Sequence, residues 1–341
     1  MIFLALTSLG LAAFITSLAI AWWLAVSGNQ PLDLPGARRS HTLPTPRGGG
    51  LGPAIAIVAF GIGPFLLVEP KPISLLLLAF VLVGAVGWRD DHRGVARRWR
   101  LLAHAGGALL MVCALWPELP GIAADSATLL RLAIGLGFAL LIIASINLHN
   151  FMDGIDGLLA LQAAFIASFL CFLPGVALDQ TLLVPALVTA VACLGFLPLN
   201  FPRARIFMGD VGSTVIGLTV ALLLLIAVRH RHLEPASALV LPILFVIDSG
   251  LTLATRLART RRWYHGHRAH TYQWLVRAGL AHRTVSLSFL LLNLTLVAPL
   301  VLMIENNPLQ QWWFAGFAYA AAALAWFATR ALVARRMRAR R

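Results

Sequence analysis

Charged residues are scarce in this chain of 341 residues, at 12% of the total, whereas 60% of the residues are apolar. Soluble domains usually contain about a quarter of charged residues, so the composition argues against a soluble protein. Cysteine is scarce too: only Cys113, Cys171 and Cys193 are present, and all three lie in apolar runs. Cysteine behaves there as a small hydrophobic residue. The sequence therefore indicates neither a disulfide framework nor a cysteine-based metal site.

Several motifs are also missing. The chain has no G-x-x-x-x-G-K-[ST] phosphate loop, and no connection between apolar runs is long enough for a soluble nucleotide-binding domain. It shows no clear inverted repeat of the kind found in many secondary transporters. No basic residue precedes the first apolar run, which is too long for a signal-peptide core. We expect this run to be retained as a membrane helix.

Apolar runs of about 20 residues, the length that crosses a hydrocarbon core, recur along the chain. They predict an all-α polytopic membrane protein with a single domain, residues 1–341. We expect eleven transmembrane helices, at residues 2–26, 50–68, 72–88, 101–116, 127–147, 157–175, 181–199, 213–228, 236–256, 285–304 and 311–330.

The distribution of basic residues predicts the orientation. The net charge of +14 comes from residues in short connections, so it does not indicate nucleic-acid binding. All 27 Lys and Arg residues except Lys71, Arg131, Arg229 and Arg231 fall on alternate connections or on the C-terminal tail. By the positive-inside rule, the N-terminus is outside and the C-terminus is cytoplasmic. Seven carboxylates then belong to the cytoplasmic side: Asp33, Asp90, Asp91, Asp153, Asp156, Asp210 and Asp248.

The stretch Asn147–Leu158, between two predicted helices, is the richest in polar residues. Its Asn and Asp residues recur every third position, at 147, 150, 153 and 156. A helix that continued past the membrane would aim their oxygens to one side. The two Asp-Gly steps are equally typical of a turn. This stretch alone supports a polar hairpin and an oxygen-rich site about equally.

Two earlier cytoplasmic segments also contain candidate site residues. In Pro31–Gly52, His41 and Arg47 could meet a phosphate group, and the glycines after Arg47 allow a close approach to a ligand. Farther on, Asp90 and Asp91 are adjacent. Such a pair usually has a cation beside it, and both a neighbouring arginine (Arg89 or Arg93) and Mg²⁺ fit that requirement.

Two later segments complete the set. Gly209–Thr214 places a carboxylate, two hydroxyl groups and backbone N–H groups at a helix N-terminus, which suits a phosphate–metal ligand or a helix cap. Arg256–Gln273 combines histidines with arginines and indicates a diphosphate-binding patch more than a zinc site. Asp248 lies within a predicted span, where an ionisable residue usually faces a cavity or a partner. We expect an ion pair with a loop arginine.

The motifs D-x-P…R-x-x-H…P-T-P-R-G-G, D-D-x-x-G, N-x-x-N-x-x-D-G-x-D-G-L and F-M-G-D-x-G-S occur in this order, followed by a C-terminal His cluster. This series resembles the polyprenyl-phosphate N-acetylhexosamine-1-phosphate transferases, glycosyltransferase family 4. The resemblance extends over nearly the whole chain. It implies transfer of N-acetylhexosamine 1-phosphate from a UDP-sugar to undecaprenyl phosphate, with release of UMP, at the cytoplasmic face of a bacterial inner membrane.

The resemblance also implies a cofactor and partners. The cofactor is Mg²⁺, for which Mn²⁺ could substitute, and the partners are the UDP-N-acetylhexosamine, undecaprenyl phosphate and the bilayer. No nucleic acid is involved, and a homodimer is compatible with the resemblance.

Residue roles follow from position in the motifs. Asn150 and Asp210 resemble the metal-binding residues, with Asp153 beside them at the diphosphate. Asp90 and Asp91 resemble the pair near the acceptor phosphate, with Asp90 the favoured base. The other positions are Asp156, Asn200 and Phe207 near the uridine, and His267, Arg268 and His270 around the diphosphate.

The C-terminal cluster reads H-G-H-R-A-H-T-Y-Q from residue 265, which is closest to the O-antigen-initiating branch of the family. Two alternatives remain. One is the muramoyl-pentapeptide transferase of peptidoglycan synthesis. The other, from a different class, is a secondary transporter whose cytoplasmic carboxylates gate ion entry.

The orientation gives a first test. A cysteine placed at position 150 should be labelled by a membrane-impermeant reagent only after the cytoplasmic face has been exposed. Labelling of this position from outside in intact cells would contradict the whole assignment.

Overall fold

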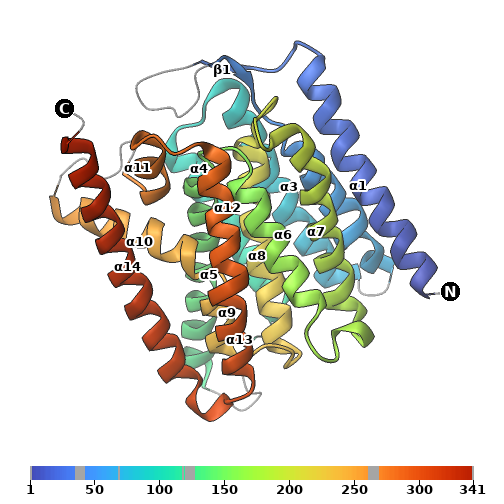
Figure 1. Cartoon of the computed structure of the whole chain (residues 1–341). Helices are drawn as coiled ribbons and strands as arrows, with labels where there is room; N and C mark the ends of the chain where they lie inside the picture. Colours follow the sequence, from blue (N-terminus) through green and yellow to red (C-terminus); the bar gives the residue numbers. More distant parts are fainter. Residues whose placement is uncertain are drawn as a thin grey trace.

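The computed structural model describes residues 2–34, 43–67, 70–116, 119, 127–259 and 269–339. These residues form a bundle of α-helices, most of which run between the same two ends (Figure 1). The α-helices are α1 (Ile2–Val26), α2 (Leu51–Ala56), α3 (Pro70–Arg93), α4 (Arg97–Ala114), α5 (Thr128–Met152), α6 (Leu158–Cys171), α7 (Gln180–Asn200), α8 (Gly209–Arg229), α9 (Pro235–Val240), α10 (Ile243–Arg259), α11 (Thr271–Arg277), α12 (His282–Leu292), α13 (Ala298–Glu305) and α14 (Gln311–Ala339).

Seven helical segments in the described part of the chain are long and apolar enough to cross a membrane. Two further apolar segments, Leu51–Phe65 and Leu158–Cys171, are shorter. Of the other two predicted spans, 101–116 lies in α4, which begins with a turn rich in arginine. The span 236–256 is divided between α9 and α10. The protein is therefore a helical, polytopic membrane protein, while the count of eleven spans stays a prediction.

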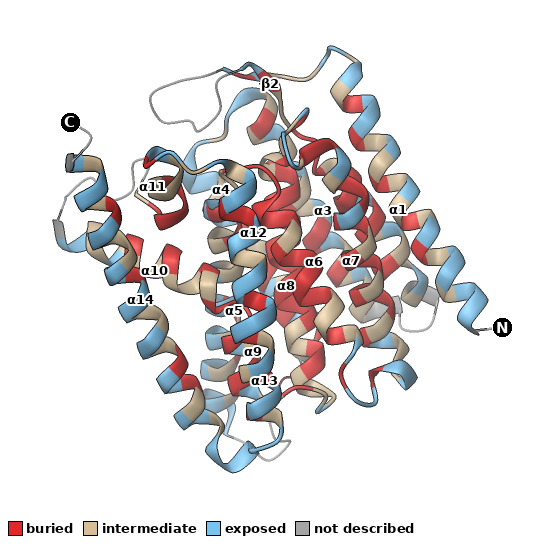
Figure 2. Cartoon of the chain, viewed as in Figure 1, coloured by how far each residue is buried: buried red, intermediate tan, exposed pale blue. Residues whose placement is uncertain are grey.

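Helix α8 is the centre of the bundle. Within its apolar stretch 83% of the residues are buried by the rest of the protein, against 17% in α1 and in α14 (Figure 2). Helices α3, α5, α6 and α7 all contact α8. Apolar residues on every side of α8 therefore pack against protein, whereas α1 and α14 present leucine and aromatic side chains outward, as expected in lipid.

The two chain ends lie at opposite ends of the bundle (Figure 1). The N-terminus of α1 is far from the connections that follow α5 and α7, and the C-terminus of α14 is at their end. This relative arrangement agrees with the orientation inferred from the arginines. Which end faces the cytoplasm stays a prediction.

Two local features differ from the expectation of continuous helices. A two-stranded antiparallel pair, β1 (Leu32–Asp33) with β2 (Thr45–Pro46), forms in the connection after α1. The predicted span 236–256 is broken between Val240 and Ile243. Pro242 lies in the break, and a proline cannot donate the N–H that would continue the helix. Beyond the break, α10 diverges toward α14 (Figure 1).

The glycines after Arg47 pack against backbone. The N–H groups of Gly49 and Gly50 donate to the carbonyl oxygens of Phe207 and Met208 at 2.9 and 2.8 Å. A Cβ at Gly50 would lie 2.4 Å from the Cα of Gly212. We expected these glycines to admit a ligand, and at Gly50 this is wrong, because the residue admits the start of α8 instead.

This contact predicts the effect of adding one methyl group. Gly50→Ala should lower the free energy of unfolding by about 1–3 kcal/mol, the usual cost of overpacking, since backbone cannot move aside easily. Gly137→Ala is the matched control, because Gly137 lies in α5 with no atom within 4 Å of its added Cβ. The measurement is the thermal unfolding midpoint in detergent, and equal midpoints for the two variants would contradict the packing.

Candidate active site

One end of α8 is capped by a carboxylate from another helix. Asp91, in the last turn of α3, accepts the N–H of Asp210 at 2.9 Å and that of Val211 at 3.0 Å. Gly209 precedes them with φ of 76°, and a Cβ there would lie 2.6 Å from the Asp91 carboxylate. Asp91 is only 4% exposed. It therefore accepts hydrogen bonds from the free N–H groups of the first turn, and its negative charge interacts favourably with the positive end of the helix dipole.

A guanidinium group links the other two carboxylates of this region. Arg100, in the first turn of α4, donates to Asp90 at 2.5 Å and to Asp210 at 3.3 Å. Asp90 also accepts the N–H of Val95, in the turn between α3 and α4. In the described part of the chain the arginine bonded to Asp90 is thus Arg100, and not the neighbouring Arg89 or Arg93 that the sequence suggested.

Helix α5 brings an amide to the same carboxylate. Asn150 donates to Asp210 at 2.6 Å and to the Ser213 hydroxyl at 2.9 Å. Asn147, one turn earlier, donates instead to the carbonyl of Ile143 within its own helix. The predicted three-residue series of oxygens on one side is thus only partly realised.

Both interpretations of Asn147–Leu158 apply to part of it. Helix α5 continues to Met152, beyond the predicted end, and residues 153–157 then form a turn. Gly157 has φ of 77° and leaves room for the Phe201 ring, while a Cβ at Gly154 would lie 2.1 Å from the Tyr272 hydroxyl. Tyr272 donates to the carbonyl of Phe151 at 3.0 Å. The turn is therefore fixed on both sides by aromatic residues.

Asp156 and Asn200 connect this turn to two other elements. Asp156 faces His282 with 3.1 Å between Oδ1 and Nδ1, and it accepts the N–H of Ala204 at 3.2 Å. Asn200, at the end of α7, accepts the N–H of Gly157 at 2.9 Å and donates to the carbonyl of Ile206 at 3.0 Å. Both side chains hold backbone segments in place as well as lining the pocket described below.

The strand pair places two further groups. Arg47 lies 3.4 Å from Asp33, measured from Nη2 to Oδ1, directly after β2. Phe207 donates its backbone N–H to the carbonyl of Pro46 at 2.8 Å. The connection after α1 therefore rests on the connection before α8.

Asp248 repeats the capping arrangement on a second helix. Its carboxylate accepts the N–H of Thr271 at 2.7 Å, that of Tyr272 at 3.4 Å and the indole N–H of Trp326 at 2.9 Å. In the described part of the chain its partners are thus N–H groups and not the arginine that we expected. His270 precedes this helix, and its ring stacks on Tyr272 with 5.7 Å between centroids.

These elements enclose a pocket of about 230 Å³. Its lining contains most of the residues predicted from the motifs and several others: Asp33, Arg47, Asn150, Asp153, Gly154, Ile155, Asp156, Asn200, Phe207, Gly209, Asp210, Gln273 and His282. Asp90 and Asp91 do not line this pocket. Asp90 is connected to it through Arg100 and through the Asp210 carboxyl group, and Asp91 through the backbone of Asp210. His270 is buried under α11. His41, His267 and Arg268 lie outside the described residues.

Sequence reasoning missed Arg100, His282, Gln273 and the pocket position of Asp33. Arg100 had been counted only as one of the arginines that set the orientation. His282 stands before an apolar run with no polar pattern around it, so no sequence signal identifies it. Asp33 could have been found, because it opens the first of the five motifs.

The pocket gathers negative charge. Partial burial and the charges of Asp210 and Asp91 raise the pKa of the Asp153 carboxyl well above its usual range, although Arg47 opposes this. Among the described residues here, no three His or carboxylate ligand atoms converge within 4.8 Å. Mg²⁺ usually takes one or two carboxylates and completes its shell with water and substrate phosphates. Asp210, Asp153 and Asn150 offer the appropriate oxygen atoms.

Comparisons with known proteins identify the family of this chain. The model of glycosyl transferase family 4 matches residues 73–228. A decaprenyl-phosphate N-acetylglucosaminephosphotransferase of Mycolicibacterium smegmatis is 32% identical over 316 residues, covering 80% of this chain and 75% of that protein. The chain belongs to glycosyl transferase family 4.

Other relatives of this family 4 protein have related names. A probable undecaprenyl-phosphate N-acetylglucosaminyl 1-phosphate transferase of Bacillus subtilis is 26% identical over 264 residues, covering 74% of this chain and 71% of that protein. A phospho-N-acetylmuramoyl-pentapeptide-transferase of Microcystis aeruginosa is 32% identical over 174 residues, but covers only 46% of this chain and 47% of that protein. The resemblance inferred from the motifs is therefore confirmed at the level of the family.

The raised pKa of Asp153 predicts how the stability of this family 4 protein depends on pH. Protonation of Asp153 stabilises the folded state. This contribution is complete below the ordinary pKa of an aspartate and is lost as the pH rises through the raised folded-state value. In a chelator, the thermal unfolding midpoint of the wild type should therefore fall over that range of pH.

Asp153→Asn is neutral at every pH and should show a smaller fall in the same melting series. If the two proteins lost stability in parallel, Asp153 would not be the group that titrates.

Proposed function

We propose that this protein transfers N-acetylhexosamine 1-phosphate from a UDP-sugar to undecaprenyl phosphate, releasing UMP. The lipid-diphosphate sugar formed in this way would start O-antigen or a related cell-envelope polysaccharide at the cytoplasmic face of a bacterial inner membrane. One observation carries the proposal: Asp210 lies in a polar pocket, bonded to Asn150 and Arg100, and α5 continues from Asn150 into an apolar cavity. A polar pocket beside an apolar cavity suits a nucleotide donor and a lipid acceptor.

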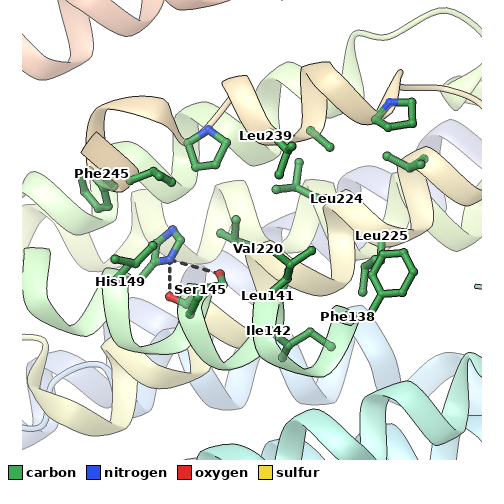
Figure 3. A pocket seen from close by; sticks show the side chains of 18 of the residues that line it. Phe138, Leu141, Ile142, Ser145, His149, Val220, Leu224, Leu225, Leu239 and Phe245 are labelled. Atoms are coloured by element: carbon green, nitrogen blue, oxygen red, sulfur yellow. Dashed lines mark hydrogen bonds between the residues drawn. The ribbon is translucent and has the colours of Figure 1, made fainter. Parts of the chain in front are cut away.

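The apolar cavity has a volume of about 400 Å³ and lies between α5, α8, α9, α10 and α14 (Figure 3). Leu141, Leu239 and Trp312 line it and are also exposed on the protein surface, so the cavity borders the lipid phase. His149 lies in its wall, next to Asn150 of the polar pocket. A cavity of this size would hold part of a polyprenyl chain, with its phosphate directed toward Asp210.

The donor would occupy the polar pocket. Asp156, Asn200 and Phe207 line one part of it, where an aromatic ring and hydrogen-bonding groups suit a uracil base. Arg47 lies in the same lining and could contact phosphate oxygens. The roles of His41, His267, Arg268 and His270 at the donor phosphates remain part of this proposal.

Mg²⁺ would be held by Asp210, with the Asn150 amide and Asp153 beside it, and Mn²⁺ could replace it. When bound, the ion would neutralise charge on the donor phosphates during phosphoryl transfer. Asp90 would accept the proton of the acceptor phosphate where one is present. A phosphate monoester has a second pKa near 6, so this contribution is small near neutral pH. Asp91 would keep Asp210 in position through the backbone of α8.

The relatives with N-acetylglucosamine in their names cover about three quarters of the chain or more. This coverage favours a simple UDP-N-acetylhexosamine over the muramoyl-pentapeptide donor, since the relatives of that second class match about half of it. Membership of a transferase family also speaks against the transporter that we had considered.

The proposal can be tested with purified protein, Mg²⁺, undecaprenyl phosphate and a panel of UDP-N-acetylhexosamines that includes UDP-muramoyl-pentapeptide. We expect UMP release with at least one simple UDP-N-acetylhexosamine. Asp210→Asn should reduce the rate by about 100-fold or more, since the carboxylate that would hold the charge-neutralising metal ion is lost. The rates of the wild type and of Asp210→Asn should be measured as UMP formed per protein chain.

Glu305→Gln is the matched control, because it makes the same carboxylate-to-amide change at the far end of the bundle, where Glu305 accepts the N–H of Glu234. It should leave the rate unchanged. Full activity of Asp210→Asn would overturn the metal assignment, and no turnover with any donor would overturn the proposed reaction.

A further inference from the structure

A second group of ligating side chains lies at the end of the bundle opposite the pocket (Figure 1). Asp179 precedes α7, and His230 and His232 follow α8. One potential ligand atom from each of the three lies within 4.8 Å of the other two, and no other group of this kind occurs among the described residues. Neither the motifs nor the proposed reaction uses these side chains.

We propose that Asp179, His230 and His232 bind a divalent transition-metal ion of the zinc type. Two imidazoles and one carboxylate, with a fourth position for water, form a common ligand set for Zn²⁺. Ligand atoms around a tetrahedral zinc lie about 3.3 Å apart, because each is about 2.0–2.2 Å from the ion. Oδ2 of Asp179 is 2.6 Å from Nδ1 of His230 and 3.0 Å from Nε2 of His232. Small side-chain movements would therefore admit the ion.

The backbone is shaped to bring the two imidazoles together. Arg231, between them, has φ of 58°, a left-handed conformation that favours glycine. The N–H of Arg231 donates to the carbonyl of Val228, and that of His232 to the carbonyl of Ala227. This is the bonding pattern of a Schellman turn, in which glycine is the usual residue at the position of Arg231. An arginine is strained in this conformation. The turn that it forms directs the rings of His230 and His232 toward Asp179.

The groups behind two of the ligands orient them as in known zinc sites. Oδ1 of Asp179 accepts both the N–H and the hydroxyl of Thr181, at 3.0 and 2.6 Å, which leaves Oδ2 for the histidines. Nδ1 of His232 faces the carbonyl of Pro174 at 3.3 Å. Histidines that bind metals usually donate their second N–H to such an acceptor.

Hydrogen-bond counting at His232 points to a metal as well. Its two ring nitrogens face the carbonyl of Pro174 and the carboxylate of Asp179. A neutral imidazole has only one N–H for these two acceptors. With an ion at Nε2, the single N–H at Nδ1 satisfies the carbonyl, and the ion satisfies the carboxylate.

The site is enclosed but reachable. The side chains of Asp179, His230 and His232 are 16%, 26% and 15% exposed. Thr181 and His230 also line a cavity of about 430 Å³ between α3, α4, α7 and α8, which provides space for a fourth ligand. Although partial burial works against it, the hydrogen bonds from Thr181 and His230 lower the pKa of Asp179 to about 2. The carboxylate is thus ionised at physiological pH.

Zinc at this position would join two connections. Asp179 and Pro174 lie in the connection between α6 and α7, and the two histidines begin the connection after α8. The ion would act as a clamp between neighbouring helix ends, independently of the reaction proposed above.

The test uses the full-length protein in detergent, with a purification tag that contains no histidine. After removal of metal with a chelator, Zn²⁺ is titrated in competition with a chromogenic chelator and in the presence of excess Mg²⁺. The wild type should bind one more tight zinc per chain than His232→Ala or Asp179→Asn. Loss of one ligand should weaken this zinc by at least about 100-fold, since loss of an outer partner alone costs 10–100-fold.

Two controls make the comparison specific. Asp179→Asn should fold, because asparagine caps a helix as well as aspartate does, and Asp179 caps α7 through Thr181. His92→Ala removes a histidine at the opposite end of the protein, and its zinc content should equal that of the wild type. Zinc should also raise the unfolding midpoint of the wild type but not that of Asp179→Asn.

A further readout does not depend on any variant. Co²⁺ added to the metal-free wild type should produce the visible absorption of a tetrahedral ion, and Zn²⁺ should remove it. Equal zinc binding by the wild type, His232→Ala and Asp179→Asn would overturn the proposal and leave an Asp–His ion pair at this position.

Discussion

The carboxylate of Asp91 accepts two N–H groups at the start of α8, and the position of the candidate site depends on this interaction. The first N–H groups of a helix have no partner within it, and few water molecules reach a helix that is buried almost throughout. A carboxylate from α3 supplies the acceptor and fixes where α8 begins. Asp210 then has a defined place next to Asn150 and Arg100. Asp248 caps the start of α11 in the same way, because its carboxylate accepts the N–H of Thr271, next to His270.

The charge balance at this end of the bundle follows from the same arrangement. Because Asp91 is bonded to the backbone of α8, Asp90 and Asp210 share Arg100. Asp153 lies near the charges of Asp210 and Asp91, and the charge of Arg47 opposes them. A pocket with an excess of carboxylates attracts cations, and a phosphorylated ligand can enter it together with a bound cation. Two relatives of the chain are named for sugar phosphate transfer, a reaction in which cations neutralise charge on the phosphates.

Much of this organisation could be predicted from the sequence, because apolar runs and arginine-rich connections report directly on the bilayer. The motifs indicated which connections meet, and the structure brings Asn150, Asp156, Asn200 and Asp210 to one pocket. The remainder depends on contacts between distant segments. Arg100 reaches Asp210 across 110 residues and His282 faces Asp156 across 126 residues. The break at Pro242 was also missed, since a single proline does not interrupt an apolar pattern.

The bond between Asp91 and α8 joins residues 119 positions apart in the chain. At a synthesis rate of about 5–20 residues per second, roughly 6–24 s separate the appearance of α3 from that of its partner. During this interval the carboxylate of Asp91 stands at the end of a finished helix without the donors that it will later bind. The order of translation thus leaves this end of α3 without its partner until α8 has been made.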